Sequence, residues 1–307
     1  MSFILPRAYR EDPSLFDGMS LGRRDPDYIR DYLPFLELMY RYWFRVEARG
    51  FANVPAEGPA LLVGNHNGGI NTPDTAMTAH AWFTQFGVER PIYALIHPAI
   101  FTVPYLNVHA MKLGGIAATA GMTMAALGAG APLLLYPGGG DEAYRPFSRR
   151  NEIMLFGRDA FVRIALRHRI PVVPVVTLGG HETLIVLDDG KRIAQALGLD
   201  RHGIERIPIS ITLPFGLTIG APSNVPFPVK IEIEVCPPVD FGGLGPEAAR
   251  DPEAVRACYD KVVAVMQATL DRMVAARAER RRQRRRKGRG AAAEPDRGPP
   301  QIAGGSQ

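Results

Sequence analysis

Cysteine is scarce in this chain of 307 residues, where it occurs only at Cys236 and Cys258. Two cysteines are too few for a disulfide framework or a four-thiolate metal site, so we expect a reducing, cytosolic setting and no bound metal. The N-terminus begins with a short apolar run that Pro6, Arg7 and Arg10 interrupt. It has neither the longer apolar segment nor the small-residue cleavage site of a secretory signal, which argues against secretion.

Long hydrophobic runs are missing as well, and a membrane-spanning helix would need about 20 consecutive apolar residues. The longest uncharged stretch runs from Ile207 to Val229 and contains five prolines and two glycines. These residues would break a helix in lipid and leave backbone groups without hydrogen bonds. Any contact with a membrane is therefore expected to be peripheral.

Three well-known catalytic and nucleotide-binding signatures do not occur. The sequence has no G-x-S-x-G elbow, no Walker loop and no G-x-G-x-x-G motif after a predicted strand. Neither cysteine lies in a recognisable catalytic motif. A serine hydrolase or a dinucleotide-dependent dehydrogenase is therefore poorly supported.

Positive charge is concentrated at the C-terminus. The chain has 36 lysines and arginines against 31 aspartates and glutamates, for a net charge of +5. Residues 277–307 hold ten basic and three acidic side chains, or +7, so the preceding 276 residues sum to −2. We expect residues 277–307 to form a disordered basic tail. Its arginine run has no interleaved aromatic residues for stacking on bases, which argues against specific nucleic-acid recognition and favours an anionic surface.

Short apolar runs alternate with helical patterns through the centre of the chain. The runs have the length of buried strands, with helical periodicity between them; the strands are expected at 60–64, 92–96, 132–136 and 172–176, and the helices at 73–85, 119–127 and 152–167. This alternation predicts an α/β fold with a mixed, largely parallel sheet that helices cover on both faces. Residues 34–276 would form this domain, after an irregular or helical lead at residues 1–33.

Two segments near the C-terminus have regular patterns. Residues 229–235 alternate apolar and polar side chains, which predicts a strand near a sheet edge with one solvent-exposed face. From about Pro252 to Met273, apolar residues recur with a helical period, which predicts a helix with one buried stripe that leads into the arginine run.

Two helix starts are predicted near the N-terminus. Asp25 is a capping residue followed by a proline at the first helical position, and Pro34 marks the second start. Residues 35–44 carry five aromatic side chains and two charges. This composition fits an interfacial membrane anchor and a helix buried in the domain equally well.

The most informative window follows the predicted strand at 60–64. His66 lies in a loop of asparagine and glycine, and Thr72-Pro73 opens the next helix with Asp74 in its first turn. Open α/β sheets bind ligands in loops that follow the carboxyl ends of strands. An ionised Asp74 near His66 could fix the imidazole tautomer and support general-base catalysis. The alternative is a turn whose histidine only bonds the backbone.

A second window follows the predicted strand at 132–136. Three consecutive glycines, Gly138 to Gly140, can bring bare backbone amides close to an anion or an oxyanion. Glu142 and Arg145 would share one face of a short helical turn and could hold a polar head group together. The alternative is a surface ion pair worth at most about 1 kcal/mol.

Four blocks of sequence, in order, resemble those of the glycerophospholipid acyltransferase superfamily over residues 34–240. They are Asn65-His66 with Asp74, Lys112 to Ile116, Tyr136 to Ala143, and Ile170 to Val175. The Pro-Gly-Gly form of the third block is more similar to the diacylglycerol-acyltransferase-like branch than to the lysophosphatidate branch. Seven residues separate His66 from Asp74 where the superfamily usually has four, so the pair is kept only if the three additional residues bulge outward.

The resemblance implies transfer of a fatty acyl group from acyl-CoA to a hydroxyl of a glycerolipid or glycerophosphate acceptor. Acyl-CoA would be a co-substrate, and no cofactor is expected. The residues with implied roles are the base His66, its orienting carboxylate Asp74, the oxyanion-binding amides near Gly138 and Gly139, and the acceptor-positioning Glu142 and Arg145, whose guanidinium could hold a phosphate.

A lipid acceptor implies work at a membrane, peripherally on its cytoplasmic face, with the basic tail on anionic lipids. One alternative is a non-enzymatic anionic-lipid or nucleic-acid-binding protein that acts through this tail. Another is a hydrolase that uses the same histidine and aspartate to activate water. His181, His97 and Lys112 are weaker site candidates, and residues 207–229 could pack as a loop or line an acyl-chain groove.

Overall fold

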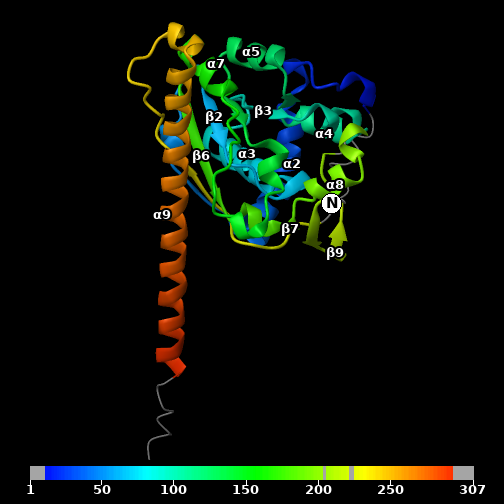
Figure 1. Cartoon of the computed structure of the whole chain (residues 1–307), viewed down its shortest axis with the longest axis vertical. Coiled ribbons are helices and arrows are strands. Elements are labelled where there is room, and N and C mark those ends of the chain that lie inside the picture. The colour runs from blue at the N-terminus through cyan, green and yellow to red at the C-terminus, as the bar shows by residue number, and fades with distance from the viewer. Residues whose placement is uncertain (1–10, 203–204, 221–224, 293–307) are drawn as a thin grey trace, which may run out of the picture.

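The computed structural model describes residues 11–202, 205–220 and 225–292 (Figure 1). A seven-stranded sheet lies at its centre, in the order β1 (Glu47–Arg49), β10 (Glu232–Val235), β6 (Val172–Leu178), β2 (Leu61–Gly64), β5 (Leu133–Leu135), β3 (Tyr93–Ile96) and β4 (Gly115–Ala117). The strands from β6 to β4 pair in parallel, while β10 is antiparallel to β6 and parallel to β1. This arrangement confirms the predicted mixed, largely parallel sheet.

Apolar side chains on the two faces of the sheet form two separate layers. Leu61 and Val63 of β2 point into one layer and Leu62 into the other, so the strand is buried on both sides. The first layer is covered by α5 (Ala120–Gly128), α7 (Ala160–His168) and α9 (Pro252–Ala292), and the second by α2 (Pro26–Leu38) and α3 (Pro73–Phe86). A smaller cluster packs around α4 (Leu106–Lys112).

The N-terminal helix starts where the sequence predicted, but there is no second start. Asp25 caps α2 by accepting a hydrogen bond from the Tyr28 N–H (3.0 Å). Pro34 lies inside α2, and the helix then continues as a π-helical turn at Met39–Trp43. The proline removes one backbone hydrogen bond, but Ile29 and Leu36 on either side of it are buried in the apolar layer under α2, which holds the helix together.

The aromatic segment at residues 35–44 belongs partly to the core. Phe44 is buried in the same layer, whereas Leu38 and Tyr42 are exposed. Neither of the two interpretations of this segment describes it fully, because its two sides differ.

Helix α7 is shorter than predicted and begins at Ala160 rather than near residue 152. Two N–H groups of the preceding backbone donate to distant side chains rather than to helix carbonyls: Ile153 to Gln267 (2.9 Å) and Met154 to Glu142 (3.1 Å). Phe156 then adopts a left-handed conformation (φ 54°), which ends any helix in progress.

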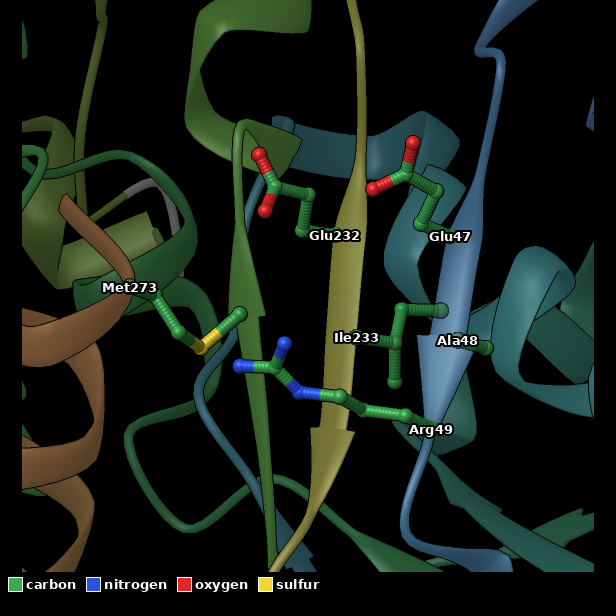
Figure 2. Close-up of a pocket in the computed structure, with 6 residues that line it drawn as sticks. All are labelled: Glu47, Ala48, Arg49, Glu232, Ile233 and Met273. Atoms are coloured by element: carbon green, nitrogen blue, oxygen red, sulfur yellow. The ribbon is translucent and has the colours of Figure 1, made fainter. Parts of the chain in front are cut away.

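Strand β10 does not have the exposed face that its alternating pattern predicted. Glu232 is only 5% exposed, because Arg277 and Arg280 of α9 lie over it and bond its carboxylate. Its register partner on β1 is Glu47, and Figure 2 shows these two carboxylates on neighbouring strands. The shallow hollow drawn there is lined by Glu47, Ala48, Arg49, Glu232, Ile233 and Met273, and it does not include His66.

The expected disordered tail is also partly wrong. Helix α9 continues through the arginine run to Ala292, and Arg277 is a buried part of the domain rather than the first residue of a tail. The helix is long and straight, and its arginine-rich end projects beyond the rest of the molecule (Figure 1). Residues 293–307 lie outside the described part of the chain. Among the described residues, no helix has both the length and the apolar composition to cross a membrane.

The uncharged stretch from Ile207 contributes to a second, three-stranded sheet. Its antiparallel strands are β7 (Ile185–Asp188), β8 (Ile209–Thr212) and β9 (Gly216–Ile219), with α8 (Lys191–Ala196) between the first two. Strand β9 is an edge strand, and much of its surface is apolar and exposed.

Candidate active site

The carboxyl ends of β2, β5 and β6 lie side by side and lead into the loops of both sequence windows. Asn65, directly after β2, is fully buried. Its side chain donates to the carbonyl oxygen of Thr177 (3.0 Å) and accepts from the Thr177 N–H (2.8 Å). These two bonds prolong the ladder between β2 and β6, and so they fix the point at which the chain leaves the sheet toward His66.

His66 and Asp74 are in contact although seven residues separate them. His66 Nδ1 lies 3.4 Å from Asp74 Oδ2. Between them the chain turns at Gly68, which is left-handed (φ 76°), and forms a 3-10 turn at Gly69–Asn71. This turn takes up the additional loop length, so the longer spacing does not separate the two side chains.

Asp74 is held rigidly at the start of α3. Its side chain is fully buried, with Oδ2 accepting from the Asn67 N–H (2.8 Å) and Oδ1 from the Thr75 N–H (2.8 Å). The N-terminus of a helix favours a negative charge. The carboxylate is therefore in place to accept a hydrogen bond from the Nδ1–H of His66, which would leave Nε2 as the basic nitrogen.

The imidazole of His66 has a fixed orientation and remains accessible. Its ring stacks on Tyr136, with centroids 4.6 Å apart and planes at 21°. The His66 side chain is 16% exposed. Within the described residues no hydrogen-bond partner occupies Nε2, so this nitrogen is available to an incoming group.

Glu142 anchors the loop that carries His66. Its side chain is fully buried and accepts hydrogen bonds from the His66 N–H (2.9 Å) and the Met154 N–H (3.1 Å). Burial raises the pKa of Glu142 to about 7, against the opposing effect of the neighbouring Arg145. Glu142 lies on the short helix α6 (Gly139–Ala143), so it ties the second window directly to the first.

Residues 45–178 match the model of a protein family described as Acyltransferase. The match contains the whole of the arrangement around His66. This match confirms, for residues 45–178, the resemblance to the glycerophospholipid acyltransferase superfamily that the four sequence blocks indicated.

Proteins similar to this chain occur in mycobacteria and in humans. Uncharacterized proteins of Mycobacterium bovis and Mycobacterium tuberculosis are 30% identical over 244 residues, which is 80% of this chain and 66% of theirs. The matched part thus spans just under two thirds of these relatives. Acyl-CoA wax alcohol acyltransferase 2 of Homo sapiens is 26% identical over 114 residues, 33% of this chain and 34% of that protein.

Among solved structures, the 1-acyl-sn-glycerophosphate acyltransferase of Thermotoga maritima superposes with a TM-score of 0.49 at 18% identity. The superposition covers 89% of this chain and 88% of that one.

Arg145 is a buried structural residue, which corrects the expectation that it holds a phosphate. It is 1% exposed, and each of its five N–H donors has a protein acceptor. The acceptors are the carbonyl oxygens of His66, Glu142, Arg149 and Arg150 and the side-chain oxygen of Asn67, at 2.8 to 3.1 Å. No donor of Arg145 is left for a substrate, so Arg145 and Glu142 hold the loop around His66 instead.

The triple glycine has a different use from the one expected. A Cβ at Gly138 would lie 2.3 Å from the Glu142 carboxylate, and one at Gly139 would lie 2.9 Å from Arg158. These glycines therefore let side chains approach the loop closely. The Gly139 N–H donates to the Tyr136 carbonyl oxygen (3.0 Å), which removes it as an oxyanion donor. The Gly138 N–H remains a candidate.

The weaker candidates lie in structural positions. His181 is 2% exposed and its Nε2 donates to the Arg145 carbonyl oxygen (2.7 Å); burial lowers its pKa to about 3. His97 caps a 3-10 turn by accepting from the Ala99 N–H. Lys112 pairs with Glu11 and Asp25, each at 3.0 Å, and so ties the N-terminal lead to α4.

The sequence analysis assigned no role to three residues that lie beside His66. Asn67 and Asn65 flank it and carry the hydrogen bonds that shape its loop, and Tyr136 provides the surface on which its ring lies. The two asparagines gave a signal that could have been used, since an amide that follows a buried strand needs a partner for its donors and acceptor.

Proposed function

We propose that the protein transfers a fatty acyl group from acyl-CoA to a hydroxyl group of a glycerolipid or glycerophosphate acceptor. The observation that supports this most is the contact of His66 with the buried Asp74, within the residues that match the Acyltransferase family. The human relative is named for an acyl-CoA donor and an alcohol acceptor, which supports the same chemistry.

The reaction needs a base rather than a protein nucleophile, because a thioester is already activated. The hydroxyl of the acceptor would give its proton to Nε2 of His66 while its oxygen attacks the thioester carbonyl carbon. Asp74 would stabilise the imidazolium through Nδ1, and the Gly138 amide is the candidate donor to the oxyanion. The carbon–sulfur bond then breaks, and the imidazolium returns the proton to the departing CoA thiolate.

Mass spectrometry of the products tests this function directly. The protein is incubated with one long-chain acyl-CoA and, in turn, with glycerol 3-phosphate, a lysophospholipid, a monoacylglycerol and a diacylglycerol. We expect an acylated product from at least one acceptor, with release of an equal amount of CoA. Release of free fatty acid without any acylated lipid would instead identify a hydrolase that activates water with the same pair.

A lipid acceptor requires contact with a membrane, and two surfaces favour one end of the molecule for it. The last turns of α9 carry five exposed arginines, Arg281, Arg282, Arg284, Arg285 and Arg286. The β8–β9 hairpin exposes Phe215, Leu217 and Ile219 at 61%, 66% and 72%. The arginines and the hairpin lie toward the same end of the molecule in Figure 1, opposite α5. The chain that leaves the carboxyl end of β6 also runs toward this end through β7. This combination suits an anionic bilayer, which attracts the arginines and accepts the apolar hairpin.

Binding to lipid vesicles should depend on both surfaces. Replacing Leu217 and Ile219 with serine is expected to weaken binding to anionic vesicles at least tenfold, because two exposed apolar side chains are lost. Raising NaCl from about 0.05 M to about 0.5 M should weaken wild-type binding steeply, because salt screens the arginines. Co-sedimentation measures both effects. The matched control is Met124→Ser on α5 at the opposite end, and equal loss in this control would contradict the proposed orientation.

A further inference from the structure

Three cations from separate segments meet at one carboxylate beside the active-site loop. Asp141 is 12% exposed and lies on α6 next to Glu142. Lys191 Nζ is 2.5 Å from its Oδ1 and Arg206 Nη2 is 2.8 Å from the same atom, while Arg158 pairs with Oδ2. Burial works to raise the pKa of Asp141, but Lys191 and Arg206 outweigh it and lower this pKa to about 2, so the carboxylate is ionised.

One carboxylate cannot neutralise three cations. Among the described residues, the other acidic side chain within ion-pair distance of these cations is Glu205, which lies 3.8 Å from Arg206 but is 75% exposed. Arg158 and Lys191 are 48% and 39% exposed, so they stay open to solvent and to a ligand. Like charges gathered at one point repel each other unless an anion joins them. The arrangement therefore has the charge of an anion site with one carboxylate fixed inside it.

An exposed aromatic ring borders the same cations. Phe156 is 45% exposed, and its centroid lies 6.0 Å from the guanidinium carbon of Arg158 and 5.8 Å from Lys191 Nζ. Its backbone is left-handed (φ 54°), a conformation that is unfavourable for a bulky residue. Strain of this kind persists where the surrounding structure holds it, often at a binding site. A flat ring beside cations suits a base that carries phosphates.

The cluster and His66 lie on two sides of one loop. Arg158 Nη1 donates to the carbonyl oxygens of Pro137 and Gly138, and Arg206 Nη1 donates to that of Gly140. On the inner side of the same segment, Glu142 accepts from the His66 N–H. A ligand with phosphates at one end and a reactive carbonyl at the end of a long flexible arm can reach both sides.

We propose that Arg158, Lys191 and Arg206, together with the ring of Phe156, bind the phosphorylated nucleotide end of the acyl donor. The inference rests on the proposed function, because it takes CoA as the carrier of the acyl group. The cations contact the phosphate oxygens, and Phe156 packs on the adenine ring. The flexible arm then crosses the glycine loop to bring the thioester to His66.

The first test measures binding without catalysis. CoA is titrated into wild-type protein and into the double variant Lys191→Gln and Phe156→Ala, and the heat of binding is followed. We expect the variant to bind CoA at least tenfold more weakly, with an unchanged melting temperature. The control is Arg256→Gln, an exposed arginine that pairs within α9 and should bind CoA like wild type. Equal affinity in all three proteins would overturn the proposal.

The second test compares donors and acceptors. The double variant should raise KM at least tenfold for an acyl-CoA, but not for the matching S-acyl pantetheine, which lacks the nucleotide and its phosphates. If KM rises instead only for a phosphate-bearing acceptor, the cluster binds the acceptor head group and the proposal is wrong. The two hypotheses can fail separately. If the wild type binds CoA through these residues but transfers no acyl group, only the proposed function is refuted. If the double variant transfers from acyl-CoA with an unchanged KM, only this inference is refuted.

Discussion

Alanine in place of His66 is expected to lower the rate of acyl transfer by about 10²–10⁴-fold, the usual contribution of a general base. The expectation follows from the geometry of the ring. Nδ1 faces the buried Asp74, Nε2 has no hydrogen-bond partner within the described residues, and stacking on Tyr136 prevents the ring from turning away. The rate is measured as transfer of a radiolabelled acyl chain from acyl-CoA to the best acceptor.

His66 is a better probe of the chemistry than its partner. Its side chain is partly exposed, so alanine leaves no buried group without a hydrogen bond, and the melting temperature should change little. Removing the Asp74 carboxylate would leave the buried N–H of Asn67 without its acceptor and would take one of two acceptors from the Thr75 N–H, so it would also destabilise the loop. His168→Ala, at an exposed histidine of α7, is the matched control. Near wild-type transfer by the His66 variant would exclude this residue as the base.

The parts of the fold that the sequence predicted well are those that local pattern determines. Of the four central strands, β2, β5 and β6 are buried on both faces and β3 is partly buried, so all four had to be short continuous apolar runs. Each run was found in the sheet within about one or two residues of its expected limits, with β6 extending further to Leu178. The contact of His66 with Asp74 could also be anticipated, because a strand end and a helix start at the same sheet edge bring their side chains together.

The parts that were missed depend on partners far away in the chain. Arg145 looked like a free cation beside glycines, and only the folded structure brings it the carbonyl of His66 and the side chain of Asn67. Glu232 looked solvent-exposed because its strand alternates, and only packing of α9 against the sheet covers it. Charge and periodicity identify residues that need a partner, but they do not identify the partner.

The burial of the Glu232 carboxylate under α9 predicts a large effect on stability. Replacing Arg277 with alanine is expected to lower the free energy of unfolding by about 3 kcal/mol. Arg277 is 8% exposed, and its guanidinium bonds the carboxylates of Glu232 (2.8 Å) and Glu182 (3.1 Å) and the carbonyl oxygen of Lys230 (2.9 Å). Alanine would leave Glu232 buried with the more exposed Arg280 as its remaining partner, and breaking a buried pair from one side is costly. Urea unfolding measures the loss.

Two comparisons separate this pair from the charge of the arginine run. Arg281→Ala removes the same charge from an exposed position of α9 and should change stability by less than about 0.5 kcal/mol.

The stabilisation by Arg277 should also depend on pH. Burial works to raise the pKa of Glu232, but the pairs with Arg277 and Arg280 outweigh it and hold this pKa below the ordinary value of 4.5. The stabilisation is therefore complete above pH 4.5 and is lost as the pH falls below it. A difference between wild type and Arg277→Ala that persists unchanged in acid would show that packing of the side chain, rather than the ion pair, holds α9 to the sheet.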